Sequence, residues 1–184
     1  MSEGNLKERL IIQGMEELRL HGMQGFSLRR VASACGVSCA APYKHFEDKQ
    51  ALFLAMVDYI NEKWDERVRE SFSFSQSVER TIAHYAVDYV KFLCDNPQFK
   101  SILMIKETGL DLPIATHAAG ISIPLGRLFV IYRRKRSLTR AQLRERLFIV
   151  RSLMYGSTII FGVDDGTRED KLDVLYAAVL KALS

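Results

Sequence analysis

The sequence has few residues that would interrupt a helix. Four prolines and eleven glycines are spread over 184 residues, and strand-like alternation of apolar and polar residues is scarce. Apolar residues instead recur three and four positions apart almost throughout, a spacing that is typical of amphipathic helices. We therefore expect an all-α protein of about nine helices.

Cysteine and long apolar runs are also scarce. The three cysteines form no Cys-x-x-Cys pair, and Cys35 and Cys39 lack the nearby partners that would complete a zinc site. The longest uncharged run, residues 112–126, contains two prolines and is short for a membrane span. The first residues show no apolar signal-peptide core. We expect a reduced cytoplasmic protein with no metal, no cofactor and no membrane partner.

The composition favours a folded, non-enzymatic protein. Hydrophobic residues make up 48% of the chain and charged residues 26%, so the chain can bury a substantial core. The 26 Lys and Arg exceed the 22 Asp and Glu by four, which is compatible with a polyanionic partner without requiring one. The chain lacks a phosphate-binding Gly-rich loop with Lys, a nucleophile elbow and a His-Glu-x-x-His helix. We predict that it is not an enzyme.

Capping and breaking residues divide the chain into helices. Ser27 and Thr167 are placed to cap helices, and Thr139 with Gln142 has the spacing of a capping box. Residues 71–77 have the composition of a loop, and residues 108–124 are rich in Gly and Pro. The expected helices begin near Leu6, Ser27, Ser38, Glu47, Val78, Asn96, Leu125, Thr139 and Thr167.

The segment around Gly36 has the dimensions of a helix-turn-helix. Gly36 suits a positive φ between a helix that begins near Ser27 and a short helix that we expect Ser38 to cap. Ala32 is small where the two helices would cross. An ordinary helical hairpin has the same dimensions, but the second helix is short and its outward residues are small or able to form hydrogen bonds, as insertion into a DNA groove requires.

Residues 6–57 resemble the DNA-binding region of the tetracycline-repressor (TetR) family. The matching positions are Gly25, Phe26, Ser27, Val31, Ala32, Ala34, Gly36, Val37, Ser38, Tyr43, His45, Phe46, Lys49 and Leu52. The chain departs from many members in residues 39–42, Cys-Ala-Ala-Pro. Pro42 lacks the N–H that would bond to Ser38, so the first turn of the third helix either tolerates a missing bond or begins one residue later.

The resemblance and the side-chain chemistry predict a double-stranded, pseudo-palindromic DNA operator as partner. Hydroxyl groups and the Lys49 ammonium suit phosphates, whereas Lys44 suits guanine and the alanines suit thymine methyl groups. Arg29 and Arg30 could reach the DNA backbone or remain solvated. An exposed Cys39 thiol could also respond to oxidation, although a small groove-facing residue explains it equally well. The predicted DNA-binding residues are Ser27, Arg29, Ser38, Cys39, Ala40, Ala41, Tyr43, Lys44, His45 and Lys49.

The resemblance also implies two domains, with DNA binding in residues 1–50 and effector binding and dimerisation in residues 51–184. In the family the last two long helices pair as a four-helix bundle, which places two reading elements about 34 Å, or a multiple, apart. Helical stripes in these segments fit that role, and they fit the core of a single subunit equally well. The candidate interface residues are Leu147, Val150, Met154, Leu172, Leu175 and Val179.

A small-molecule effector is a further expectation. Aromatic and Met side chains with few charges suit an apolar or aromatic compound, although each could be ordinary core. The candidates are Trp64, Tyr85, Tyr89, Phe92, Met104 and His117. The interpretation is a transcriptional regulator, in particular a repressor that its effector releases from the operator. The alternative is a DNA-bound adaptor of the same fold whose C-terminal domain binds a protein. The basic run Arg133–Arg136 is either a solvated helix end or a second anionic contact.

Overall fold

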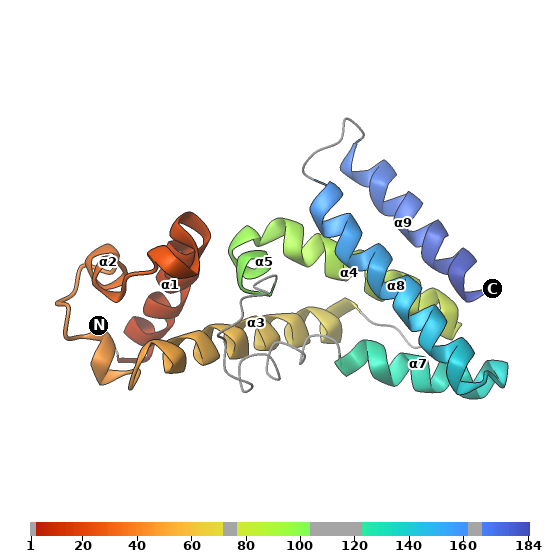
Figure 1. The fold of residues 1–184 in the computed structure, drawn as a ribbon, viewed down its shortest axis with the longest axis horizontal. Coiled ribbons are helices and arrows are strands. Elements are labelled where there is room, and N and C mark those ends of the chain that lie inside the picture. The colour runs from red at the N-terminus through yellow and green to blue at the C-terminus, as the bar shows by residue number, and fades with distance from the viewer. Residues whose placement is uncertain (1–2, 72–76, 104–122, 162–166) are drawn as a thin grey trace. The chain divides into compact units, whose positions relative to one another are not determined.

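A computed structural model describes residues 3–71, 77–103, 123–161 and 167–184. This part of the chain contains helices and no strand, which confirms the all-α class. The elements are α1 (Glu3–Gly25), α2 (Leu28–Ala34), the 3₁₀ turn η1 (Pro42–Lys44), α3 (Lys49–Ser71), α4 (Val78–Asp95), α5 (Pro97–Leu103), α7 (Ile123–Arg136), α8 (Arg140–Ile160) and α9 (Arg168–Leu183), as Figure 1 shows. No described helix is both long enough and apolar enough to cross a membrane.

The helices begin where capping side chains satisfy exposed backbone N–H groups. The hydroxyl of Ser27 accepts the N–H of Arg30 at the start of α2, and that of Thr167 accepts the N–H of Asp170 in α9. At α8 the hydroxyl of Thr139 accepts the N–H of Gln142, whose side-chain oxygen accepts the N–H of Thr139 in return. The capping box and the two other caps therefore confirm the helix starts that the sequence predicted at these residues.

Two glycines provide the backbone turns that flank α2. Gly22 has φ 62° and introduces a kink near the end of α1, so the regular part of that helix ends close to the predicted position. Gly36 has φ 68°, in the left-handed region that side chains with a Cβ rarely adopt. The positive φ predicted for Gly36 is therefore confirmed.

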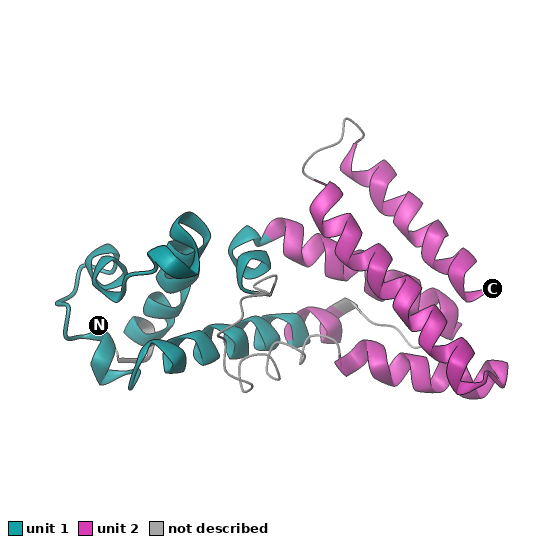
Figure 2. Ribbon diagram, in the orientation of Figure 1, with its two compact units in different colours: residues 1–65, 96–121 teal, residues 66–95, 122–184 magenta. Residues whose placement is uncertain are grey.

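The chain forms two compact units, one of residues 1–65 and 96–121 and one of residues 66–95 and 122–184 (Figure 2). The division falls inside α3, and α5 groups with the first unit. The functional division after residue 50 remains a prediction, since compactness alone does not define it.

In the first unit α1 packs closely against α3. Gly14 of α1 is buried, and a Cβ at this position would collide with the side-chain methyl group of Met56. The core around this contact is apolar, which is the main source of its stability. Its buried residues include Leu10, Met15, Leu18, Val31, Ala32, Phe46, Leu52, Val57 and Ile60.

The third expected helix differs from the prediction. Ser38 does not cap a helix; the only regular turn in this segment is η1, whose N-cap is Ala41. Because Pro42 has no N–H, the carbonyl of Ser38 accepts the N–H of Ala41 at 3.0 Å, three residues on, in place of an α-helical bond. Helical structure therefore starts at Pro42, further along the chain than the shift of one residue that the sequence allowed.

In the second unit α4 packs against α7, α8 and α9. A buried charge fixes its first turn. The Glu79 carboxylate is nearly inaccessible to solvent and accepts hydrogen bonds from Lys135 at 3.1 Å and from Arg136 at 2.8 Å, both at the end of α7. Burial by itself raises the pKa of Glu79, but the backbone N–H of Glu79 and the two cations outweigh this effect and lower its pKa to about 2.

The Glu79 cluster predicts a pH-dependent stability. The folded-state pKa lies below the ordinary value of 4.5, so the carboxylate stabilises the fold above about pH 4.5 and this contribution is lost as the pH falls toward 2. Glu79→Gln should lower the free energy of unfolding at pH 7 by about 2 kcal/mol, since both cations are half-exposed and partly screened. Urea titrations at several pH values measure the difference, which should shrink between pH 5 and pH 3. Glu145→Gln, an exposed change on α8, is the control; a pH-independent difference for Glu79→Gln would contradict the prediction.

Candidate nucleic-acid interface

Glu17 of α1 holds the N-terminal end of α2. Its side chain is only 8% exposed, and one carboxylate oxygen accepts the N–H of Ser27 at 3.1 Å and the Nε of Arg30 at 2.8 Å. A second nitrogen of Arg30 bonds the same oxygen and also the carbonyl of Gly25. Negative charge is favourable at a helix N-terminus, so Glu17 fixes where α2 begins.

Arg9, also in α1, holds the opposite end of α2. Its guanidinium donates to the carbonyl of Cys35, the C-cap residue, at 2.7 Å. A cation at this end complements the helix dipole and satisfies a carbonyl that has no partner within the helix. One helix therefore supplies a group of the appropriate charge to each end of α2.

The ionisation of Glu17 depends on these contacts. Burial would raise its pKa, but the hydrogen bonds from Arg30 and Ser27 and the charges of Arg30 and His21 lower it below the ordinary value. The carboxylate is therefore charged at neutral pH, and the ion pair with Arg30 is part of the folded structure.

The turn after α2 presents its side chains to solvent. Pro42 and Phe46, which anchor the turn in the protein, are both buried. The N–H of Phe46 donates to the carbonyl of Pro42 at 2.9 Å. Between them Tyr43 is 59% exposed, and Lys44 is exposed as well. A rigid turn with buried ends and exposed polar residues is a surface that can enter a groove of DNA.

The predicted DNA-binding residues fall into two segments on either side of α2. Ser27 and Arg29 lie at its start, whereas the others follow its end in the turn and at the first residue of α3. Their exposure decides what each can do. The exposed members are Arg29, Ser38, Cys39, Ala40, Tyr43 and Lys44, and the half-buried members are Ser27, Ala41, His45 and Lys49.

The adjacent arginines of α2 have different roles. Arg30 is held by Glu17 and by the carbonyl of Gly25. Arg29 is exposed and forms no side-chain bond to another described residue. Only Arg29 is therefore available to a phosphate without breaking a contact within the fold.

Lys49 is partly used by the protein itself. Its ammonium lies 3.3 Å from the carbonyl of Met23 and over the rings of Phe26 and Phe53, 5.0 and 5.3 Å from their centroids. The contacts with Met23 and Phe26 join the first residue of α3 to the end of α1 and to the connection that follows it. At the same helix end the carboxylate of Asp48 accepts the N–H of Ala51 at 2.7 Å.

The four effector candidates that the structure describes are buried, and they do not all lie in one unit. Trp64 belongs to the first unit, whereas Tyr85, Tyr89 and Phe92 lie along α4 in the second. Burial raises the pKa of Tyr89 far above its ordinary value, so its hydroxyl stays protonated. Met104 and His117 lie outside the described residues. The cavity itself remains a prediction.

Most of the candidate interface residues face into their own subunit. Five of them, Val150, Met154, Leu172, Leu175 and Val179, are buried, and Leu147 is half-buried. The apolar side chains that α8 and α9 leave exposed are not among these six candidates. They include Phe148, Ile149, Tyr155, Ile159, Ile160 and Val174. The interface itself remains a prediction.

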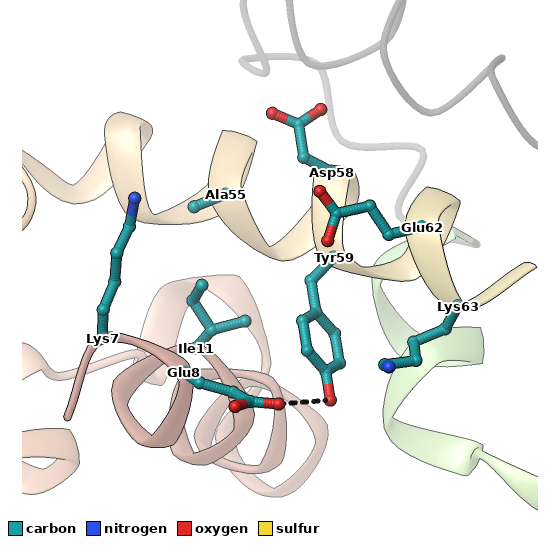
Figure 3. A pocket seen from close by; sticks show the side chains of 8 residues that line it. All are labelled: Lys7, Glu8, Ile11, Ala55, Asp58, Tyr59, Glu62 and Lys63. Atoms are coloured by element: carbon teal, nitrogen blue, oxygen red, sulfur yellow. Dashed lines mark hydrogen bonds between the residues drawn. The ribbon is translucent and has the colours of Figure 1, made fainter. Parts of the chain in front are cut away.

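A groove of about 450 Å³ lies between α1 and α3 of the first unit, as Figure 3 shows. The hydroxyl of Tyr59 donates to Glu8 at 3.3 Å across it. Three carboxylates against two ammonium groups disfavour a phosphate here, so this groove is not part of the nucleic-acid interface. The residues that line it are Lys7, Glu8, Ile11, Ala55, Asp58, Tyr59, Glu62 and Lys63. Among the described residues, no group of three His, Cys, Asp or Glu could hold a metal ion.

Comparison with known proteins agrees with this reading of the first unit. Residues 10–56 match the model of the bacterial regulatory proteins, tetR family. No match was found among curated proteins.

Solved structures share the fold over nearly the whole chain. The fatty acid degradation regulator FadR from Bacillus halodurans has a TM-score of 0.78 at 16% identity, covering 100% of this chain and 96% of that one. A TetR family transcription regulator from Marinobacter aquaeolei VT8 scores 0.79 at 16% identity, covering 98% and 96%. FadR from Bacillus subtilis in complex with stearoyl-CoA scores 0.77 at 15% identity, covering 96% of each chain. At such identities the likeness establishes the fold.

The two arginines of α2 form a matched pair for mutation. Arg30→Gln should lower the free energy of unfolding by about 2 kcal/mol, because it leaves the buried Glu17 carboxylate without its cation. Arg29→Gln should change it by less than about 0.5 kcal/mol, as surface substitutions do. Urea denaturation followed by circular dichroism measures both values. Equal effects of the two substitutions would show that the Glu17 contact does not stabilise the fold.

Proposed function

We propose that this chain, which carries the DNA-binding domain of the TetR family of bacterial regulators on residues 10–56, is a homodimeric transcriptional repressor that a small apolar effector releases from its operator. The observation that carries the proposal is the exposed turn after α2, held by buried anchors at a position that matches the family's DNA-binding region. DNA binding by the turn, dimerisation and effector binding are separate steps, and each has its own test.

Recognition of the operator combines positioning with limited base readout. Arg29, Tyr43 and Lys49 are assigned to phosphates, where they fix the register of the protein on the duplex. Lys44 is assigned to guanine, and Cys39, Ala40 and Ala41 to thymine methyl groups or to the shape of the groove. Since η1 is one 3₁₀ turn, few side chains reach base edges, and DNA shape contributes a larger share of specificity.

A second copy is proposed to dock on the exposed face of α8 and α9. Phe148 is 72% exposed, and Tyr155 and Ile159 follow it on the same side of α8 at intervals of seven and four residues. Val174 of α9 is 69% exposed. A groove of about 330 Å³ between the two helices is lined mainly by apolar side chains. Exposed apolar surface of this kind marks an interface, and a two-fold axis would supply the second reading element.

The effector is proposed to be a molecule with a long apolar part. Three similar structures carry names that refer to fatty acid metabolism: the two FadR proteins and a putative fatty acid metabolism regulator from Clostridium perfringens. One of them is complexed with stearoyl-CoA. Tyr85, Tyr89 and Phe92 give the second unit a buried aromatic row on α4, which suits an apolar ligand. An effector that prefers one arrangement of the body would alter DNA affinity through that preference.

A DNA-bound adaptor is the second candidate function. In that case the exposed apolar side chains of α8, such as Phe148, would bind a protein partner. The exposed turn after α2, called the reading turn below, would bind DNA in the same way as in the repressor.

Binding to DNA is the first test. Selection from random duplexes with the full chain should return a pseudo-palindromic site. On that site, Lys49→Gln should weaken binding and lower the slope of log affinity against log salt by about 1 per half-site, because an ammonium leaves the phosphates. Tyr43→Phe should weaken binding and leave the slope unchanged, since no charge is removed. A wild-type slope for Lys49→Gln would show that the Lys49 ammonium contacts the Met23 carbonyl and the two rings but no phosphate. Recovery of no site by selection would refute the proposed function.

The proposed interface predicts the oligomeric state. Phe148→Glu should yield a monomer in analytical ultracentrifugation at micromolar concentration, because it places a charge in the apolar contact. Operator affinity should fall by about 100-fold, as expected when two linked half-site contacts become independent. Glu145→Gln, one helical turn away on the exposed side, is the control and should remain dimeric. A dimeric Phe148→Glu protein would place the interface on another surface.

Thermal unfolding with ligands tests the effector. Stearoyl-CoA at about 100 times its dissociation constant should stabilise the protein by about 2.7 kcal/mol and release the operator, whereas coenzyme A alone should do neither. Failure of stearoyl-CoA and of a wider metabolite panel to shift the transition, together with specific retention of a protein from a cell extract, would favour the adaptor.

A further inference from the structure

The positive charge of the chain is concentrated far along the sequence from the reading turn. Residues 123–160, which form α7 and α8, contain nine Lys and Arg against one Asp or Glu. The rest of the chain contains 17 Lys and Arg against 21 Asp and Glu, and residues 1–50 contain seven Lys and Arg against six Asp and Glu. The most basic part of the protein is thus in the second unit, outside the segment to which DNA reading is assigned.

One face of α7 combines these cations with exposed apolar side chains. Ile123, Val130 and Ile131 are 55%, 51% and 51% exposed. Arg127 and Arg134 are also exposed and fall on the same stripe, because spacings of three, four and seven residues repeat on one side of a helix. The opposite face consists of Leu125, Leu128, Phe129 and Tyr132, which are buried in the second unit.

The cations on the stripe are available to a partner. Arg127 and Arg134 form no side-chain bond with another described residue. By contrast, Lys135 and Arg136 are engaged by Glu79, and Arg133 donates to the carbonyl of Leu138 at 3.3 Å. The stripe therefore offers two free guanidinium groups beside three aliphatic side chains.

We propose that the α7 stripe, defined as Ile123, Arg127, Val130, Ile131 and Arg134, binds the surface of a membrane that contains anionic phospholipids. A helix with basic and apolar side chains on one face lies at the boundary of headgroups and acyl chains, where guanidinium groups bind phosphates and aliphatic groups are removed from water. This proposal departs from the sequence-based expectation of no membrane partner, which rested on the lack of a segment long enough to span a bilayer; surface binding needs no such segment. The proposal is independent of the operator-binding function.

Other occupants fit the α7 stripe less well. A second copy related by a two-fold axis would bring Arg127 and Arg134 against like charges. The DNA backbone would neutralise both arginines, but it would leave Val130 and Ile131 exposed to water. The stripe is the outer face of a single helix, so a bilayer can receive it without a complementary groove.

Co-sedimentation with vesicles tests the proposal on the full chain. The wild type should bind vesicles of phosphatidylcholine containing phosphatidylglycerol, bind pure phosphatidylcholine vesicles weakly, and lose binding as salt is raised. The double variant Arg127→Gln, Arg134→Gln should weaken binding by about 25-fold, because each cation near the membrane surface contributes a factor of about five. Val130→Ser with Ile131→Ser should weaken it by about tenfold at unchanged charge.

A matched control removes two exposed cations elsewhere, with Arg69→Gln and Lys181→Gln. It should bind vesicles at most a few-fold more weakly than the wild type. The proposal is overturned if the wild type shows no preference for anionic vesicles, or if the control loses as much binding as the α7 arginine variant. It is also overturned if the α7 arginine variant alters operator affinity or oligomeric mass while neither the wild type nor any variant binds vesicles. Because operator binding by the wild type is measured separately, failure here leaves the proposed DNA function standing.

Discussion

The arrangement of the DNA-binding unit depends on the two polar contacts through which α1 holds α2. A helix of seven residues is too short to be stable by itself, and α2 spans only Leu28–Ala34. Glu17 accepts the N–H of its N-cap residue Ser27, and Arg9 donates to the carbonyl of its C-cap residue Cys35. The turn that follows has one 3₁₀ turn and no helix of its own. Its position is therefore set by α2, and through α2 by α1.

These contacts also explain how little positive charge is left for DNA. In residues 1–50 the cations exceed the anions by one. Arg9 and Arg30 bond to the protein itself, and the ammonium of Lys49 is partly engaged by the carbonyl of Met23. Free cations near the reading turn are accordingly few, with Arg29 and Lys44 the exposed members of the predicted set. On the proposed function, affinity comes from accurate placement and from two copies acting together, which requires a rigid scaffold and a dimer.

The sequence predicted features that local chemistry determines. Helix caps such as Ser27 and the positive φ of Gly36 depend on a few neighbouring residues and were read correctly. Glu17 and Arg30 are 13 residues apart, and Arg9 and Cys35 are 26 apart, so helical spacing did not reveal these pairs. The available signal was Glu17 itself, a charged residue beside Leu18 in the buried stripe of α1. On α8 both faces carry apolar residues, with Val150 inside and Phe148 outside, and periodicity cannot assign either face to the interface.

The most direct test of this account is the operator affinity of Glu17→Gln, measured where circular dichroism shows the variant to be folded. Loss of the carboxylate leaves Arg30 without its partner and weakens the contact with the N–H of Ser27. The substitution alters none of the predicted DNA-binding residues. The account predicts a fall in affinity of about tenfold, corresponding to about 1.4 kcal/mol. Wild-type affinity in a folded Glu17→Gln protein would contradict it.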